Sequence, residues 1–197
     1  MAALPQTWIS PDEYLARESE AEYKSEYVDG VVHAMAGASP LHNLIALNVG
    51  AELRSGLRGG PCLAYASDLK VATPNRKRLS YPDASVICGE PALVEGRKDV
   101  VTNPTVLIEV LSEGTAGYDR GPKFLAYQSI PGLQEYVLVS QDEPRVECYR
   151  RQGDGWFYTR VEGLDGALRL HSVGCELKLS EVYLGVTWPG VAEDGSG

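Results

Sequence analysis

The 197-residue chain lacks any apolar run that approaches the roughly 20 residues of a membrane-spanning helix. Its first residues, Met1 to Gln6, also lack the basic flank and apolar segment of a signal peptide. We therefore expect a cytoplasmic protein that makes no contact with a membrane.

Cysteine is scarce, and its spacing is wide. The four cysteines, Cys62, Cys88, Cys148 and Cys175, form no C-x-x-C pair, which argues against a structural zinc site. Cys88 falls within an apolar strand pattern and Cys148 next to one. We expect reduced thiols packed in the interior, as in a reducing compartment.

Positive charge is in short supply, with 18 Lys and Arg against 27 Asp and Glu and a net charge of −9. This balance argues against a protein that coats nucleic acid with a basic surface. It does not exclude a nuclease, because a carboxylate-rich site is negative until its metal binds. Two small basic clusters, Arg76-Lys77-Arg78 and Arg54 with Arg58, either face DNA or are solvated surface.

The chain length and the 44% share of hydrophobic residues fit one globular domain, which we place at residues 8–187. Residues 188–197 are predicted to be a flexible tail. Apolar periodicity and turn residues predict the following elements. Helices are expected at 11–20, 39–57 and 122–130, and strands at 23–35 (a hairpin), 63–73, 79–88, 106–111, 135–140, 145–151 and 156–162. The predicted class is mixed α/β (α+β), with a central mixed sheet flanked by helices and extra strands at both ends.

Two carboxylates interrupt otherwise apolar strand patterns. Asp83 follows Pro82, which removes a ladder donor, and Glu109 is the only charge between Val106 and Leu111. A buried carboxylate is costly unless it is paired, hydrogen-bonded or bound to a metal. Each carboxylate also has a purely structural explanation: Asp83 could lie in a turn, and Glu109 could pair with Lys or Arg. A shared Mg²⁺ site explains both at once.

A nearby cation is the third element of a metal-assisted phosphodiester hydrolase. Asp119, Lys123 and Tyr127 are spaced i, i+4, i+8 and so lie along one stripe of a predicted helix. The alternative is a solvated helix face with an Asp–Lys pair.

With these motifs in this order, the chain resembles the Uma-two family. That family is similar to the PD-(D/E)XK, or restriction-endonuclease-like, nucleases. The resemblance runs from about Trp8 to Tyr183. It is carried by these segments: Glu26-Tyr27-Val28-Asp29-Gly30, Ser39-x-x-His42, Tyr81-Pro82-Asp83, Pro104-x-x-x-Ile108-Glu109-Val110-Leu111-Ser112, Asp119-x-x-x-Lys123-x-x-x-Tyr127 and Glu135-Tyr136.

The resemblance implies a metal-binding role for Asp83 and Glu109, and the Val110 carbonyl is a further candidate ligand. The superfamily lysine two residues after the acid is absent, because Leu111 stands there. The family supplies its lysine from the next helix, which maps onto Lys123.

Three more positions match the family. Glu26 is implied as a further ligand or orienting group, and His42 matches a family histidine. His42 could instead be a helix-start residue bonded to backbone, and Tyr127 could serve packing alone.

The expected function is an endonuclease that depends on Mg²⁺ or Mn²⁺ and cuts DNA, with RNA not excluded and a homodimer expected. Two alternatives stay open. The first is a nuclease-fold module that binds nucleic acid or a protein without cutting, and the second is a structural protein whose acids pair with Arg or Lys.

Overall fold

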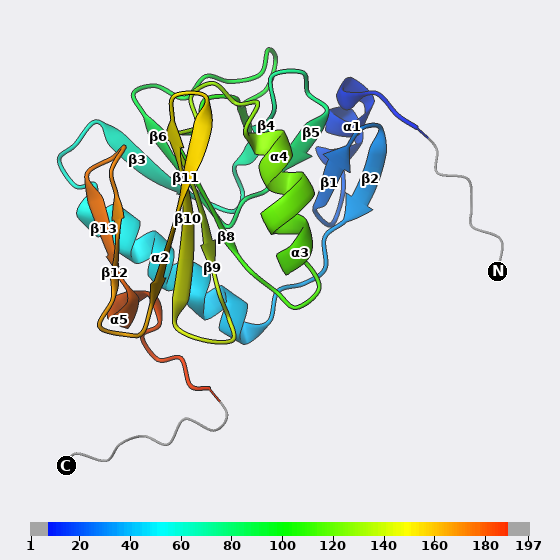
Figure 1. Cartoon of the computed structure of the whole chain (residues 1–197). Coiled ribbons are helices and arrows are strands. Elements are labelled where there is room, and N and C mark those ends of the chain that lie inside the picture. The colour runs from blue at the N-terminus through cyan, green and yellow to red at the C-terminus, as the bar shows by residue number, and fades with distance from the viewer. Residues whose placement is uncertain (1–7, 189–197) are drawn as a thin grey trace.

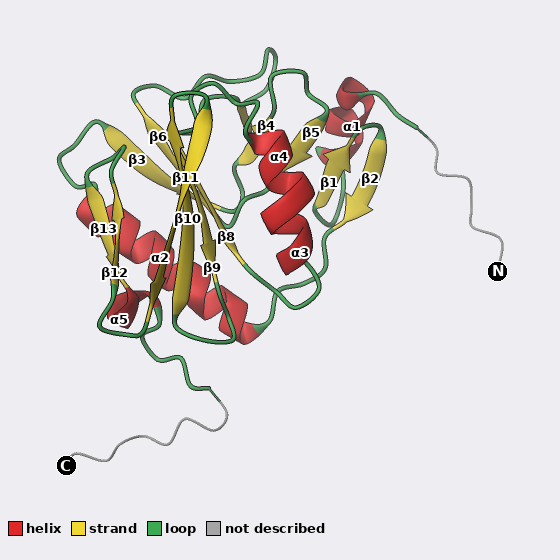
Figure 2. Ribbon diagram, viewed as in Figure 1, coloured by secondary structure: helices red, strands yellow, loops and turns green. Residues whose placement is uncertain are grey.

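A computed structural model describes residues 8–188 of the chain, and its helices and strands are arranged around two sheets (Figures 1 and 2). Ser10 caps the first helix by accepting a hydrogen bond from the Glu13 amide. Ser39 caps the long second helix through the His42 amide. The helical elements are α1 (Pro11–Glu18), α2 (Pro40–Gly56), α3 (Ala116–Tyr118), the π-helical η1 (Asp119–Lys123), α4 (Phe124–Tyr127) and α5 (Leu179–Val182).

The larger sheet has six strands in the order β11-β10-β9-β8-β6-β3. It is mixed, since β8 and β9 run parallel while the other neighbours run antiparallel. Its strands are β3 (Cys62–Ala66), β6 (Ala84–Cys88), β8 (Val106–Val110), β9 (Glu135–Val139), β10 (Arg145–Gln152) and β11 (Gly155–Glu162).

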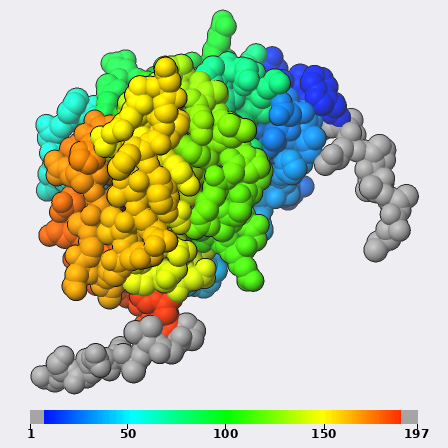
Figure 3. Space-filling model, viewed as in Figure 1, coloured from blue at the N-terminus to red at the C-terminus, as the bar shows by residue number. Residues whose placement is uncertain are grey.

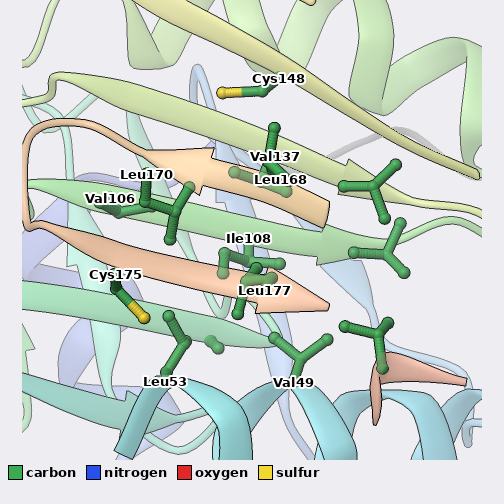
Figure 4. Close-up of a cluster of buried hydrophobic side chains, with 14 of the residues drawn as sticks. Val49, Leu53, Val106, Ile108, Val137, Cys148, Leu168, Leu170, Cys175 and Leu177 are labelled. Carbon is green, nitrogen blue, oxygen red and sulfur yellow. The ribbon is translucent and has the colours of Figure 1, made fainter. Parts of the chain in front are cut away.

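Opposite faces of this sheet carry two separate cores, because successive strand residues point to opposite sides. Val106, Ile108 and Val110 face α2, α5 and a hairpin of β12 (Ala167–Leu170) and β13 (Cys175–Lys178). Figure 4 shows side chains of α2 meeting those of β8, β12 and β13 in this core. Leu107 and Leu111 face α4 on the other side. Glu109 therefore points into the face that carries the helices α3 to α4.

A second sheet, with five strands in the order β2-β1-β5-β4-β7, lies beside the first. The helix α1 covers one of its faces through Tyr14 and Leu15, which pack against Tyr27, Leu79 and Val100. In the space-filling view the N-terminal hairpin (blue) borders the face formed by α4 (green) and β11 (yellow) (Figure 3). The strands are β1 (Ser25–Val28), β2 (Val31–Ala34), β4 (Lys70–Ala72), β5 (Arg78–Ser80) and β7 (Val100–Val101).

Two expected strands are wrong as single elements, because each divides between the sheets. The 63–73 stretch becomes β3 and β4, and the 79–88 stretch becomes β5 and β6. Pro82 lacks the amide that a continuous ladder needs, so the chain crosses from one sheet to the other at Tyr81 to Asp83. This crossing places Asp83 between the sheets.

The helix expected to begin near Pro122 begins earlier. The helical segment starts at Ala116, and Pro122 lies inside the π-helical turn η1. A proline lacks the amide donor and crowds the preceding turn, and a π-helical turn is one way a helix accommodates such an interruption. Asp119 and Lys123 both belong to this turn and are buried.

The expectation of four reduced cysteines is wrong for two of them. Cys62 and Cys88 stand directly opposite each other on β3 and β6 and form a disulfide. The register explains the bond, because directly opposed strand residues bring their Cβ atoms within disulfide reach. Cys148 and Cys175 are free and buried, as expected.

The mixed α/β class with helix-flanked mixed sheets is confirmed. The strands form two larger sheets rather than one, and β12, β13 and α5 are not among the predicted elements. Within residues 8–188 no helix has both the length and the hydropathy to cross a bilayer. Of the predicted tail, residues 189–197 lie outside the described part of the chain.

Replacing Glu135 with Ala is expected to destabilise the protein by about 2 kcal/mol, since its hydrogen bonds are lost. Its fully buried carboxylate accepts hydrogen bonds from the amides of His171 and Ser172 and from the Ser172 hydroxyl. Urea denaturation measures the change. Glu176→Ala, at an exposed position of β13, serves as the control and should differ from wild type by less than about 0.5 kcal/mol.

Candidate functional site

The predicted site residues come together where the two sheets meet. Glu109 stands on β8 of the larger sheet, Glu26 on β1 of the smaller sheet, and Asp83 at the crossing between them. Lys123 reaches the same place from η1. The described residues thus gather from four segments that are far apart in the chain.

The Lys123 ammonium is the centre of this arrangement. Its Nζ lies 2.8 Å from a Glu109 oxygen, 3.4 Å from a Glu26 oxygen and 3.5 Å from an Asp119 oxygen. Lys123, Glu109 and Asp119 are each buried, and about 13% of the Glu26 side chain is exposed. One cation therefore meets three carboxylates in a poorly solvated volume, where each charge depends on its partners.

Burial and neighbouring charges shift the ionisation of this cluster. Burial raises the pKa of the Glu109 carboxyl well above its usual value, an effect that the Lys123 ammonium partly opposes. For Lys123, burial alone favours the neutral amine. Burial is the largest single effect on Lys123, but the acidic groups around it, with Glu109 first among them, together outweigh burial and raise the pKa of Lys123 well above its usual value. The ammonium therefore stays protonated across the physiological range.

Both carboxylate oxygens of Asp83 form hydrogen bonds with neighbouring groups. Oδ1 lies 2.8 Å from Nε2 of His42, and Oδ2 accepts a hydrogen bond of 2.7 Å from the Val110 amide. The Val110 contact links Asp83 to the residue that follows Glu109 on β8. Asp83, one predicted metal ligand, is thus bound to the backbone next to Glu109, the other predicted ligand.

His42 stands in the first turn of α2, and its ring is directed at Asp83 rather than at backbone. The hydrogen bond to Asp83 raises the pKa of His42 above its usual value, while partial burial opposes the shift. Nδ1 lies 3.5 Å from the side-chain nitrogen of Gln141. His42 therefore orients Asp83 from the side opposite Val110. Its own amide bonds to Ser39, so the helix-start contact is present as well.

Tyr127 is fully buried, and its hydroxyl donates a 3.2 Å hydrogen bond to Glu109. Its ring packs edge-on against Tyr136. The residue thus serves both packing and the orientation of Glu109. The structural explanation for Glu109, an ion pair with a basic residue, also holds, because Glu109 pairs with Lys123.

Sequence reasoning missed three neighbours of the site. The sequence gives Asp119 only as a member of the Asp119-x-x-x-Lys123-x-x-x-Tyr127 pattern, and Arg78 only as part of a basic cluster, with no site role for either. The i, i+4 spacing was the signal for Asp119. For Gln141, which donates to the Leu111 carbonyl and approaches His42, the sequence carries no signal.

The donors fit a hard divalent cation in their chemistry, because carboxylate oxygens are the ligands that Mg²⁺ and Mn²⁺ prefer. Among residues 8–188, however, no three Asp, Glu, His or Cys side chains are already arranged around one ion position. Glu109 and Glu26 are directed at Lys123, and Asp83 at His42 and Val110. A cation would be held by Asp83 and Glu109 once they turn from these partners. The Val110 carbonyl, named as a further ligand from the sequence, stays a prediction.

Comparison with protein families gives a match over residues 11–180 to the Uma2 family, described as "Putative restriction endonuclease". The chain belongs to the Uma2 family. Two relatives from Synechocystis sp. are described as uncharacterized proteins. The first is 36% identical over 91% of this chain and 94% of its own length, and the second is 38% identical over 79% and 88%.

The fold of this Uma2 protein has a counterpart among solved structures. A crystal structure described as "a putative nuclease belonging to DUF820", from Anabaena variabilis, has a TM-score of 0.73. The match covers 89% of this chain and 97% of that chain, at 21% sequence identity. It shows the shared fold, and membership in the family supports a nuclease-like function.

Changing Asp83 to Asn is expected to lower the pKa of His42, because the hydrogen bond to a carboxylate is what raises it. A pKa raised on folding contributes stability that is fully present below the unfolded pKa, near 6.5, and is lost as pH rises through the folded pKa. The variant should lose this part of the pH dependence. NMR titration of the imidazole measures the shift, and an unchanged pKa would contradict the contact.

Replacing Lys123 with Met is expected to destabilise the fold by about 3 kcal/mol, because three carboxylates lose their counter-charge. The double variant Lys123→Met, Glu109→Gln should recover much of that loss, since one uncompensated charge is removed. Chemical denaturation of both variants and of Glu109→Gln gives the coupling energy. Additive effects would show that the two side chains do not interact.

Proposed function

We propose that this chain is a metal-dependent endonuclease that hydrolyses phosphodiester bonds in DNA. The observation that carries the proposal is the meeting of Glu26 and Glu109 at the buried Lys123 ammonium, with Asp83 bound to the amide of Val110, the residue next to Glu109. Membership in the Uma2 family supports the reaction class. Asp83 and Glu109 are proposed to hold Mg²⁺ or Mn²⁺, with the Val110 carbonyl as a further ligand.

A divalent ion in such a site supplies polarisation of a phosphate oxygen and a lower pKa for a bound water. The chain's own part begins with Lys123, whose permanently charged ammonium offsets negative charge that develops on the phosphate. Asp119 and Tyr127 hold this region in place, through the Lys123 ammonium and the Glu109 carboxylate respectively. Glu26 holds Lys123 from the second sheet.

His42 is proposed as a positioning residue. Its Nε2 fixes one oxygen of Asp83 while the Val110 amide fixes the other, so the carboxylate has a defined plane. Orientation of ligating carboxylates by neighbouring hydrogen bonds is a general feature of metal sites. Loss of the imidazole is expected to weaken metal binding without abolishing the fold.

A second candidate is a nuclease-fold module that binds nucleic acid or a protein without cutting. It is favoured by Leu111, which stands where the strand lysine of the superfamily is expected, and by Asp83, whose two oxygens are already engaged. Calorimetry with Mn²⁺ separates the two candidates. The enzyme should bind Mn²⁺ in a way that depends on Asp83, and the module should not.

DNA and a homodimer are both part of the proposal. A two-fold enzyme suits the cleavage of two strands, and two-fold dimers are the most frequent oligomers. Cleavage assays on duplex DNA, single-stranded DNA and RNA distinguish the substrates. Sedimentation at several concentrations tests the dimer.

Cleavage of plasmid DNA with Mg²⁺ or Mn²⁺ is expected for the wild-type protein. Asp83→Ala and Lys123→Ala should each lower the rate by at least about 10²-fold, as for other preorganised charges that act on the transition state. Asp154→Ala, in the exposed turn of the β10–β11 hairpin, is the control and should match wild type. Gel electrophoresis measures the rates.

Equal rates for the wild type and both site variants would contradict the proposed mechanism, because the activity would then lie elsewhere. Cleavage that persists in excess EDTA would contradict the dependence on a metal.

A further inference from the structure

The basic cluster Arg76-Lys77-Arg78 divides in the structure. Arg76 is half-buried and pairs with Asp12, and the Lys77 ammonium lies 3.6 Å from Asp29 on the surface. Arg78 is different, since only 3% of it is exposed and its side chain points into the site. Strand alternation on β5 accounts for this, because Leu79 faces the α1 core while Arg78 and Ser80 face the other way.

The Arg78 guanidinium is held loosely. Nη1 lies 3.8 Å from a Glu26 oxygen and 3.5 Å from the Ser80 hydroxyl, and Nη2 donates to the Tyr118 hydroxyl. Nε is buried, and it has no hydrogen-bond partner among residues 8–188. A guanidinium carries five donors in a planar fork suited to carboxylate or phosphate. Arg78 therefore keeps donor capacity that the folded chain does not use.

Glu26 connects the two cations of the site. One of its oxygens lies 3.4 Å from Lys123, and the other lies 3.8 Å from Arg78. Both distances exceed that of a direct charge-assisted hydrogen bond, so Glu26 sets the spacing of the cations without neutralising either one fully. The result is a pair of positive groups on one side of the acidic cluster.

The partly exposed side chain of Tyr118 lies against Arg78. The Arg78 guanidinium lies 5.0 Å from the centre of the Tyr118 ring, and about 37% of Tyr118 is exposed. Tyr118 belongs to α3, a helix of three residues without a side-chain cap. A rotation of this side chain uncovers the guanidinium while the strand that carries Arg78 stays in place.

We propose that Arg78 binds a non-bridging oxygen of a nucleic-acid backbone phosphate, next to the position that Lys123 serves. This inference rests on the proposed function and adds a substrate-contacting residue to it. Arg78 takes the phosphate in exchange for the Tyr118 hydroxyl and uses the free Nε donor for a second hydrogen bond. A purely structural role, in which Arg78 only balances the charge of Glu26, requires no phosphate contact.

Salt dependence separates the two roles. Each phosphate contact made by Lys or Arg adds about 0.9 to the slope of log affinity against log salt for duplex DNA. We propose measuring the binding of a labelled duplex oligonucleotide by the full chain, with Ca²⁺ as the only divalent ion and the intact probe checked on a gel. Melting temperatures of all variants are recorded in parallel.

For Arg78→Gln the slope should fall by about 0.9, and the affinity should fall about tenfold, corresponding to one charge-assisted contact. Arg78→Lys keeps a charge but loses the fork, so its slope should match wild type while its affinity falls by a smaller factor. Arg76→Gln, in the same turn and paired with Asp12, should leave both values unchanged.

An unchanged slope in a folded Arg78→Gln protein would overturn the inference. If that variant does not fold, Arg78→Lys decides the question. An affinity equal to wild type would show that the planar guanidinium of Arg78 does not contact the phosphate. These outcomes differ from failure of the proposed function, in which the wild-type protein neither binds nor cuts the nucleic acid. That result would overturn both.

Discussion

The Lys123 ammonium is the interaction on which the rest of the site depends. It holds Glu109 from one sheet, Glu26 from the other and Asp119 from its own π-helical turn. Buried carboxylates repel one another, so the three acids can share this volume only because a permanent positive charge lies between them. The same contact therefore joins the two sheets and keeps a set of hard oxygen ligands together.

Much of the site could be predicted because its signals are local. A charge inside an apolar strand marked Glu109, and helical spacing placed Asp119, Lys123 and Tyr127 on one stripe. The predicted helices begin within one residue of the starts of α1 and α2. Asp83 stood out in the same way as Glu109, whereas the roles of Glu26 and His42 rest on resemblance to a family, and the structure adds the contacts: His42 with Asp83, and Glu26 with Lys123.

The remaining features depend on long-range pairing that no local pattern encodes. Apolar residues continue through 63–73 and 79–88, so periodicity alone could not reveal that each stretch divides between two sheets. The Cys62–Cys88 bond follows from the register of β3 with β6, which sequence spacing does not specify. Likewise Arg78 resembles a surface charge in the sequence because it ends a run of three basic residues, whereas in the structure it is buried.

The central claim is that this acidic cluster exists to hold a divalent ion beside a fixed ammonium. An anomalous-scattering map of crystals soaked in Mn²⁺ tests it most directly. The account predicts one strong peak shared by Asp83 and Glu109, with Lys123 adjacent to it. A map in which Glu109 still contacts Lys123 and manganese binds only at other surfaces would contradict it.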